Sequence, residues 1–224
     1  MQKADDGNDL PDRFNDFVQR NRKALFFTLG AVVLLFTGLI VFLSVNSHMQ
    51  REAIAEVEEL SRRFAEIGFL EDNYDELENL LVELNVFTAR NRSGYAGGRA
   101  WTIIGRIYSD REEWPEAEYA WYRAAKTASR TYLAPVAYFN AAVAAEENGN
   151  LERAIELLEK SISHRFEFVA APRAQFAIGR LNEQLENFPA AIDAYRQVIV
   201  RWPFMTTWAN MAQSRIIAIE VGNR

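Results

Sequence analysis

The chain has 224 residues and carries 25 Lys and Arg against 31 Asp and Glu, which gives a formal net charge of −6. It has no cysteine, which excludes disulfides, thiolate metal sites and a cysteine nucleophile. Its only histidines, His48 and His164, are too far apart in sequence to predict a metal site. The acidic balance argues against a nucleic-acid partner, which needs a concentrated basic face.

An uncharged run of 22 residues, ALFFTLGAVVLLFTGLIVFLSV, occupies positions 24–45. As a helix rising about 1.5 Å per residue, it is long enough to cross the ~30 Å hydrocarbon layer of a membrane. The alternative is a cleaved signal peptide, but its apolar core is usually shorter, and only a weak cleavage pattern, Val45-x-Ser47, follows the run. We therefore expect a retained transmembrane helix over 24–45, preceded by a tail over 1–23.

The basic residues that flank this run predict its orientation. Four basic residues precede the run on its N-terminal side: Arg13, Arg20, Arg22 and Lys23. On its C-terminal side only Arg51 is near. The N-terminus should therefore be cytoplasmic, with the rest of the chain on the outer side. In a bacterium this arrangement means a single-pass protein of the inner membrane with a periplasmic C-terminal domain.

A pattern repeats along the rest of the chain: a turn residue, a large apolar residue, two spacers, and a small or aliphatic residue near the start of a helix. It occurs as DNYDEL (72–77), EEWPEA (112–117), NGNLERA (148–154) and ENFPAA (186–191). The closing alanines Ala117, Ala154 and Ala191 are each 37 residues apart, a period typical of a helical solenoid. Pro115 and Pro189 fall in the first turn of a helix, where the missing N–H would be unpaired anyway.

The repeats predict the domain organisation. Residues 46–98 should hold a degenerate first helix pair and a flexible glycine-rich joint within ARNRSGYAGGRA (89–100), which lacks the strand and lysine of a phosphate-binding loop. Three regular pairs should follow over 99–203, and 204–224 should form a capping helix. The predicted fold is all-α: a single transmembrane helix followed by an α-solenoid with a C-terminal cap. The cap is expected to place Trp208, Met211, Ala212, Ile216 and Ile219 on one face.

The regular pairs carry a recognisable set of residues. Trp101-x-x-Ile104-Gly105-x-x-Tyr108 is followed by Ala117-x-x-x-Trp121-x-x-Ala124, and Ile178-Gly179, Ala191, Tyr195 and Pro203 form a similar set. These residues resemble the tetratricopeptide repeat signature, although the period exceeds its usual ~34 residues and the middle pair has alanines in place of the bulky residues. The resemblance implies a scaffold that binds other proteins. No nucleophile, acid–base pair or ligand cluster emerges, so we expect no enzymatic activity, cofactor or small-molecule substrate.

The first helix of each regular pair should line a concave binding face. If Trp101 and Tyr108 point into their pair, the positions beside them face this groove. The predicted groove residues are Arg99, Thr102, Arg106, Val136, Phe139, Val143, Arg173, Phe176 and Arg180. An apolar centre flanked by arginines suits a protein segment with aromatic and acidic groups. The alternative is that each arginine pairs with a neighbouring glutamate, as with Glu183 three residues after Arg180.

The N-terminal sequence DRFNDFVQRNRKALFFTLGAVVLL resembles the ancillary translocon subunit family of the bacterial inner membrane, and RNRSGYAGGRAWTIIGRI is similar to that family too. The resemblance implies a periplasmic repeat domain that associates with the secretion channel and with chaperones. LENFPAAIDAYRQVIVRWP also resembles envelope repeat proteins that assist outer-membrane or cell-wall assembly. The expected function is therefore an adaptor in envelope protein export or assembly. Two alternatives stay open: a structural subunit of a large envelope machine, such as the periplasmic flagellar motor collar, and a regulatory subunit of an enzyme.

Overall fold

A computed structural model of the chain describes residues 9–68 and 74–222, and over these ranges helices are the only regular structure. Within them nine helices follow one another: α1 (Asp9–Ile67), α2 (Tyr74–Arg90), α3 (Tyr95–Asp110), α4 (Trp114–Thr127), α5 (Leu133–Glu147), α6 (Leu151–Ile162), α7 (Ala171–Gln184), α8 (Phe188–Arg201) and α9 (Thr206–Gly222). The all-α prediction is confirmed.

The chain divides into two units, Met1–Glu52 and Ala53–Arg224, and α1 contributes residues to both. In the first unit α1 contains an apolar stretch with a mean hydropathy of 2.6, long and apolar enough to cross a membrane. Its large side chains are exposed, with Phe27 at 80% and Leu34 at 75%. By its length and composition this stretch is a candidate membrane span.

The helix α1 is longer than the predicted span 24–45 at both ends. Residues 46–67 contain neither glycine nor proline, so no residue there interrupts the backbone hydrogen bonding of a helix. The expected boundaries at 23/24 and 45/46 are therefore not helix ends. The part of α1 after Glu52 is instead the first helix of the first repeat pair.

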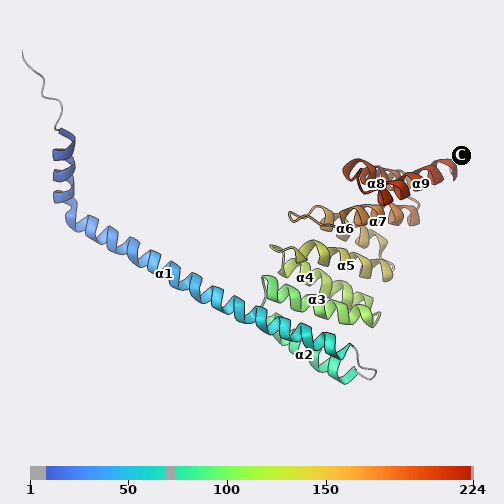
Figure 1. The fold of residues 1–224 in the computed structure, drawn as a ribbon, viewed down its shortest axis with the longest axis horizontal. Helices are drawn as coiled ribbons and strands as arrows, with labels where there is room; N and C mark the ends of the chain where they lie inside the picture. Colours follow the sequence, from blue (N-terminus) through green and yellow to red (C-terminus); the bar gives the residue numbers. More distant parts are fainter. Residues whose placement is uncertain (1–8, 69–73, 223–224) are drawn as a thin grey trace, which may run out of the picture. The chain divides into compact units, whose positions relative to one another are not determined.

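In the second unit, consecutive helices joined by short turns pack on one another as stacked pairs, from α2 at one end to α9 at the other (Figure 1). The α1 residues from Ala53 onward pair with α2, and a buried cluster holds the two together through Val57, Leu60, Leu80, Leu84 and Phe87. The regular pairs are α3 with α4, α5 with α6, and α7 with α8. Helix α9 packs mainly on α8. The predicted α-solenoid is thereby confirmed.

Small residues allow the two helices of a pair to approach closely. A Cβ atom at Gly105 would lie 2.8 Å from the indole of Trp121, and one at Gly179 would lie 2.5 Å from the ring of Tyr195. The glycine in the first helix therefore provides the space that the aromatic residue of the second helix fills. Trp121 also donates a hydrogen bond from Nε1 to Ser109 Oγ at 3.0 Å.

The turn within each regular pair has the same backbone conformation. Glu112, Gly149 and Glu186 have φ values of 59°, 78° and 57°, and each is 37 residues from the next. This left-handed conformation ends the first helix of the pair, and it favours glycine because other residues clash there. Pro115 and Pro189 then lie in the first turns of α4 and α8, as predicted.

The predicted flexible joint over 89–100 is corrected by the structure. Helix α2 runs to Arg90 and α3 begins at Tyr95, so only residues 91–94 separate them. The backbone N–H of Gly94 donates to Thr127 O at 2.9 Å, and Gly97 and Gly98 are buried within α3. Packing of these small residues against the end of α4 makes this segment part of the core.

The capping helix begins at Thr206, close to the predicted 204. Its buried residues are Ala212, Ile216 and Ile219, and Trp208 packs on the same cluster. Met211 was expected on this face but is 42% exposed. At 100° per residue it lies about 100° round the helix from Ala212 and about 140° from Ile216, which places it outside their face.

Candidate partner-binding face

The nine predicted groove residues lie on the first helices of the three regular pairs, α3, α5 and α7. They occur in three sets with a spacing of 37: 99, 136 and 173; 102, 139 and 176; and 106, 143 and 180. Helix α3 contacts α5, and ion and ring contacts join α5 to α7. Four of the nine are exposed: Arg106, Val136, Val143 and Arg173.

On α3 the two arginines are already engaged. Arg99 donates from Nη2 to Ser61 Oγ at 2.6 Å and lies 3.7 Å from Glu58, so it joins α3 to α1. Arg106 pairs with Asp110 one turn later, at 2.9 Å. Thr102 donates from its hydroxyl to the carbonyl of Arg99 at 2.6 Å. The α3 end of the face is therefore nearly neutral.

The centre of the face is apolar, as the sequence predicts. Val136 and Val143 on α5 are 43% and 39% exposed. Phe139 lies between them in sequence and is half-buried, with its ring 5.6 Å from that of Phe168. The guanidinium of Arg173 on α7 lies 5.2 Å from the same ring. Arg173 makes no ion pair within the described residues, so it presents a free positive charge beside apolar surface.

The remaining two residues stabilise the stack. Phe176 is half-buried and packs against Tyr195 at 5.1 Å and Trp208 at 5.5 Å, so its ring belongs to the cluster between the last pair and α9. Arg180 donates from both guanidinium nitrogens to the carboxylate of Glu146, each at 2.6 Å. These hydrogen bonds raise the pKa of Arg180.

The alternative pairing of Arg180 with its neighbour Glu183 does not form, although Arg180 does pair with a glutamate, Glu146. Glu183 instead accepts hydrogen bonds from Arg215 on α9 and from the Tyr195 hydroxyl. The Arg215 hydrogen bonds lower the pKa of Glu183, whereas burial raises the pKa of Tyr195. Because Glu183 faces α9, it is not available to its neighbour one turn earlier.

These contacts follow a rule that local spacing does not reveal. A glutamate in one pair bonds to an arginine 32 to 35 residues later: Glu78 with Arg111, Glu118 with Arg153, Glu146 with Arg180, and Glu183 with Arg215. The separation is about one repeat, so each contact joins one helix pair to the next pair in the stack. A search of the sequence for acidic and basic residues one repeat apart would have found them.

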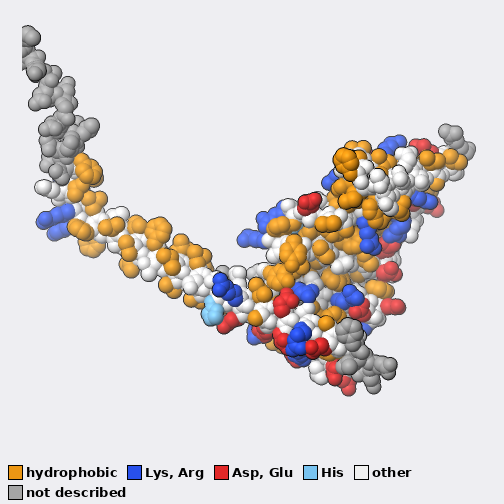
Figure 2. Space-filling view, viewed as in Figure 1, with side chains coloured by type: hydrophobic (Ala, Val, Ile, Leu, Met, Phe, Trp, Pro, Cys, Tyr) orange, Lys and Arg blue, Asp and Glu red, His pale blue; other side chains and the backbone are white. Residues whose placement is uncertain are grey.

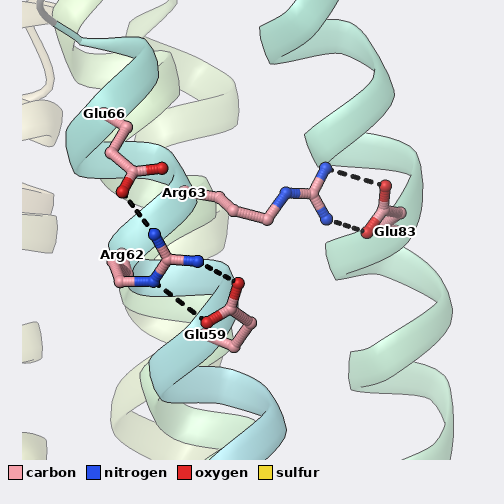
Figure 3. A network of polar contacts seen from close by, with 5 residues as sticks. All are labelled: Glu59, Arg62, Arg63, Glu66 and Glu83. Atoms are coloured by element: carbon pink, nitrogen blue, oxygen red, sulfur yellow. Dashed lines mark hydrogen bonds and ion pairs between the residues drawn. The ribbon is translucent and has the colours of Figure 1, made fainter.

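The first pair has its own polar network, shown in Figure 3. Arg63 of α1 donates to both carboxylate oxygens of Glu83 on α2, at 2.5 and 3.0 Å. Arg62 points elsewhere and lies between Glu59 and Glu66 of its own helix. Arg63 therefore joins the two helices, and its hydrogen bonds lower the pKa of Glu83.

Residues 139–206 match the family model of the tetratricopeptide repeat. This range covers most of the α5/α6 and α7/α8 pairs, including the middle pair in which alanines replace the bulky signature residues. The pair α3/α4 lies outside the matched range, although Gly105 and Trp121 pack in it as Gly179 and Tyr195 do in the last pair.

A curated relative supports the same conclusion. The chain is 43% identical over 131 residues to a "TPR repeat-containing protein" of Treponema pallidum (strain Nichols). The alignment covers 58% of this chain and 54% of the relative, so the chain spans about half the length of the relative it matches. No solved structure matches the chain significantly. The chain thus contains tetratricopeptide repeats over residues 139–206 within a helical arrangement of the same kind, and such repeats generally serve as non-enzymatic scaffolds for protein–protein interaction.

Proposed function

We propose that this protein is a membrane-anchored tetratricopeptide repeat scaffold that binds protein partners in envelope protein export or assembly. Residues 24–45 serve as the single-pass anchor in the inner membrane of a bacterium. The N-terminus lies in the cytoplasm, and the repeats lie in the periplasm. The apolar stretch of α1 and the basic residues before it support this arrangement.

The partner binds the face formed by α3, α5 and α7. The observation that carries this proposal is the exposed apolar surface of Val136 and Val143 beside Arg173, the arginine of this face that has no carboxylate partner in the described chain. Arg106 and Arg180 are neutralised by Asp110 and Glu146. A segment with an aromatic or aliphatic residue and one nearby carboxylate fits this surface.

The binding face is tested by photo-crosslinking in living cells. A crosslinking amino acid at Val143 should capture a specific protein, whereas one at Val82, an apolar residue of α2 that is 63% exposed, should not. Capture of a translocon subunit or an envelope chaperone supports the export function. Capture of flagellar motor subunits would instead support the machine-component alternative, and equal capture from both positions would reject the face.

The orientation is tested with single cysteines, which report uniquely because the chain has none of its own. A cysteine in place of Ser129, an exposed residue of the α4–α5 turn, should react with a membrane-impermeant maleimide once the outer membrane is opened. A cysteine in place of Gln19 should react only after the inner membrane is lysed. The reverse pattern would invert the proposed topology.

A further inference from the structure

The two kinds of turn in the solenoid differ in charge. The turns between pairs, taken with the helix ends that flank them, are residues 88–95, 126–132, 160–173 and 200–206; they carry eight Lys and Arg and one carboxylate, Glu167. The turns within the regular pairs, residues 110–114, 146–150 and 184–188, carry six carboxylates and one arginine, Arg111. We call the first set the inter-pair edge and the second the intra-pair edge.

Helix dipoles do not explain this difference. Every turn on either edge joins the C-terminus of one helix to the N-terminus of the next, so the partial charges of the helix ends balance within each turn. The excess of basic residues on one edge and of acidic residues on the other is therefore a property of the side chains. Figure 2 shows basic side chains toward the edge that holds the α6–α7 turn and acidic side chains toward the opposite one.

The inter-pair edge is a continuous surface. The rings of Tyr95 and Tyr132 lie 6.2 Å apart and link its first two turns. Arg165 donates to the carbonyl of Arg130 at 3.4 Å and links the second turn to the third. The third and fourth turns enclose a pocket of about 250 Å³ between them, whose apolar lining includes Phe166, Val169, Trp202 and Met205. Neighbouring turns are therefore in contact along the whole edge.

The cations of this edge are largely unpaired. Eight basic residues lie on it, and within the described chain six of them form no ion pair: Arg92, Lys126, Arg130, Arg165, Arg173 and Arg201. On the intra-pair edge, by contrast, Asp110, Glu113 and Glu146 all have arginine partners. The inter-pair edge thus keeps its positive charge free for an external anionic group.

Apolar side chains project from the same edge. Phe204 is 95% exposed, Val169 86% and Val200 76%, and these are the most exposed large apolar side chains among the described residues of the second unit. Arg165 and Arg201 lie over the rings of Phe166 and Trp202 at 4.7 and 4.6 Å. Basic residues next to exposed aromatic and aliphatic tips are typical of surfaces that enter the headgroup region of a bilayer.

The chain also enters the second unit at this edge. Glu56 of α1 binds Arg90 at 2.7 Å, and Glu58 accepts from Tyr95 at 3.1 Å, so the start of the unit at Ala53 lies beside the α2–α3 turn. Only residues 46–52 separate Ala53 from the apolar run 24–45. This step rests on the anchor proposed above. An anchor at 24–45 would tether the solenoid to the bilayer by its basic edge.

We propose that the inter-pair edge docks on the anionic surface of a lipid bilayer. Its positive side chains contact phosphate groups, and Val169 and Phe204 enter the interface. A bilayer fits better than an acidic protein segment because the most exposed apolar residues are on projecting turns rather than in a groove. The partner-binding face on α3, α5 and α7 is a separate surface that shares only Arg173 with this edge.

The test uses the full chain in nanodiscs of phosphatidylcholine, alone or mixed with phosphatidylglycerol. A fluorescent probe is attached to a cysteine that replaces Ser129 on the inter-pair edge, and a matched probe replaces Asn148 on the intra-pair edge. Quenching by lipids with spin-labelled headgroups should occur for the Ser129 probe, only with anionic lipid, and should decline as salt is added. The Asn148 probe should stay unquenched.

Charge variants make the test specific. Removing one arginine near an anionic surface lowers membrane binding roughly fivefold. Arg130→Gln, Arg165→Gln and Arg201→Gln together should therefore lower lipid contact by about two orders of magnitude. The matched variant Glu112→Gln, Glu147→Gln and Glu186→Gln should not lower it. Helix content measured by circular dichroism confirms that both variants fold.

Failure of the anchor and failure of the edge are distinguishable. If the chain does not co-elute with neutral nanodiscs, the anchor is rejected, and the same probes are then read with added anionic vesicles. Quenching that is equal at the two edges, equal with neutral and anionic lipid, or unchanged by the arginine substitutions would overturn the docking proposal. Binding of a polyglutamate peptide without lipid quenching would also overturn it, in favour of an acidic protein partner.

Discussion

Arg180 of α7 binds both carboxylate oxygens of Glu146 on α5, each at 2.6 Å, and so joins the first helices of adjacent repeat pairs. The two side chains are 40% and 26% exposed, which places the pair between a surface and a buried ion pair. Two parallel hydrogen bonds fix the geometry of the guanidinium in a way that a single charge contact does not.

This geometry predicts a measurable coupling between the two residues. Arg180→Ala and Glu146→Ala should each lower the free energy of unfolding, and a double-mutant cycle should give a coupling of about 1 kcal/mol, reduced from a buried pair by solvent screening. Arg180→Lys should recover only part of it, because lysine cannot form both hydrogen bonds. Urea denaturation in detergent measures these values. Strictly additive single substitutions would show that the pair contributes nothing.

The repeated left-handed turn predicts an increase in stability. Glu112→Gly and Glu186→Gly should each stabilise the protein by about 0.5–1 kcal/mol, because glycine adopts their positive φ without strain. Gly149→Ala, at the equivalent position, should destabilise it by a similar amount. Glu147→Gly is the control: it lies at the end of α5, outside the strained position, and should be destabilising. Circular dichroism during thermal unfolding measures these changes in stability. The prediction would be contradicted if all three substitutions to glycine changed the stability in the same direction.

The contact between Gly179 and Tyr195 predicts a strong effect of one methyl group. A Cβ at position 179 would lie 2.5 Å from the Tyr195 ring, and this ring is fully buried and cannot move aside freely. Gly179→Ala should therefore cost about 1–3 kcal/mol in the free energy of unfolding. Gly222→Ala has open space around its Cβ and should be nearly neutral. If the two variants have equal stability, the packing argument fails.

The environment of Glu183 predicts a dependence of stability on pH. Arg215 lowers the pKa of Glu183 below its ordinary value of 4.5, so the ionised carboxylate is favoured in the folded state. The resulting stability is present above the pKa of the unfolded chain and is lost as the pH falls through the lower folded pKa. The stability difference between the wild type and Glu183→Gln should therefore shrink as the pH is lowered from neutral to below 4.5. Glu147→Gln, an exposed control, should show no such change, and a difference that is constant with pH would reject the prediction.

The features that sequence predicted well are those set by local spacing. Pro115 and Pro189 identified helix starts because proline fits only the first turn of a helix. Gly105 with Trp121 and Gly179 with Tyr195 identified helix pairs, because a missing Cβ and a large ring at this spacing fill one another's volume. These rules act within one repeat, and the structure confirms the pairs they predicted.

The features that the sequence did not predict depend on contacts between residues about one repeat apart, or on the absence of a glycine or proline that would end a helix. Local spacing offers Glu183 as an alternative partner of Arg180 because the two are one turn apart, yet the stacking of the pairs places Arg180 against Glu146, 34 residues earlier. The predicted span ends at residue 45 because the hydrophobic run ends there, whereas helix α1 continues because residues 46–67 contain neither glycine nor proline. The glycines at 97 and 98 suggested a joint by composition and are instead buried in α3.

The shared backbone conformation of Glu112, Gly149 and Glu186 has a consequence for how the molecule changes in length. Cutting the chain after any of these three residues and rejoining it after another removes or duplicates a block of 37 residues, or a multiple of it, and keeps a residue of positive φ at the junction. The solenoid is therefore modular in the genetic sense: a whole unit can be gained or lost in one event, and the length of the solenoid changes in discrete steps.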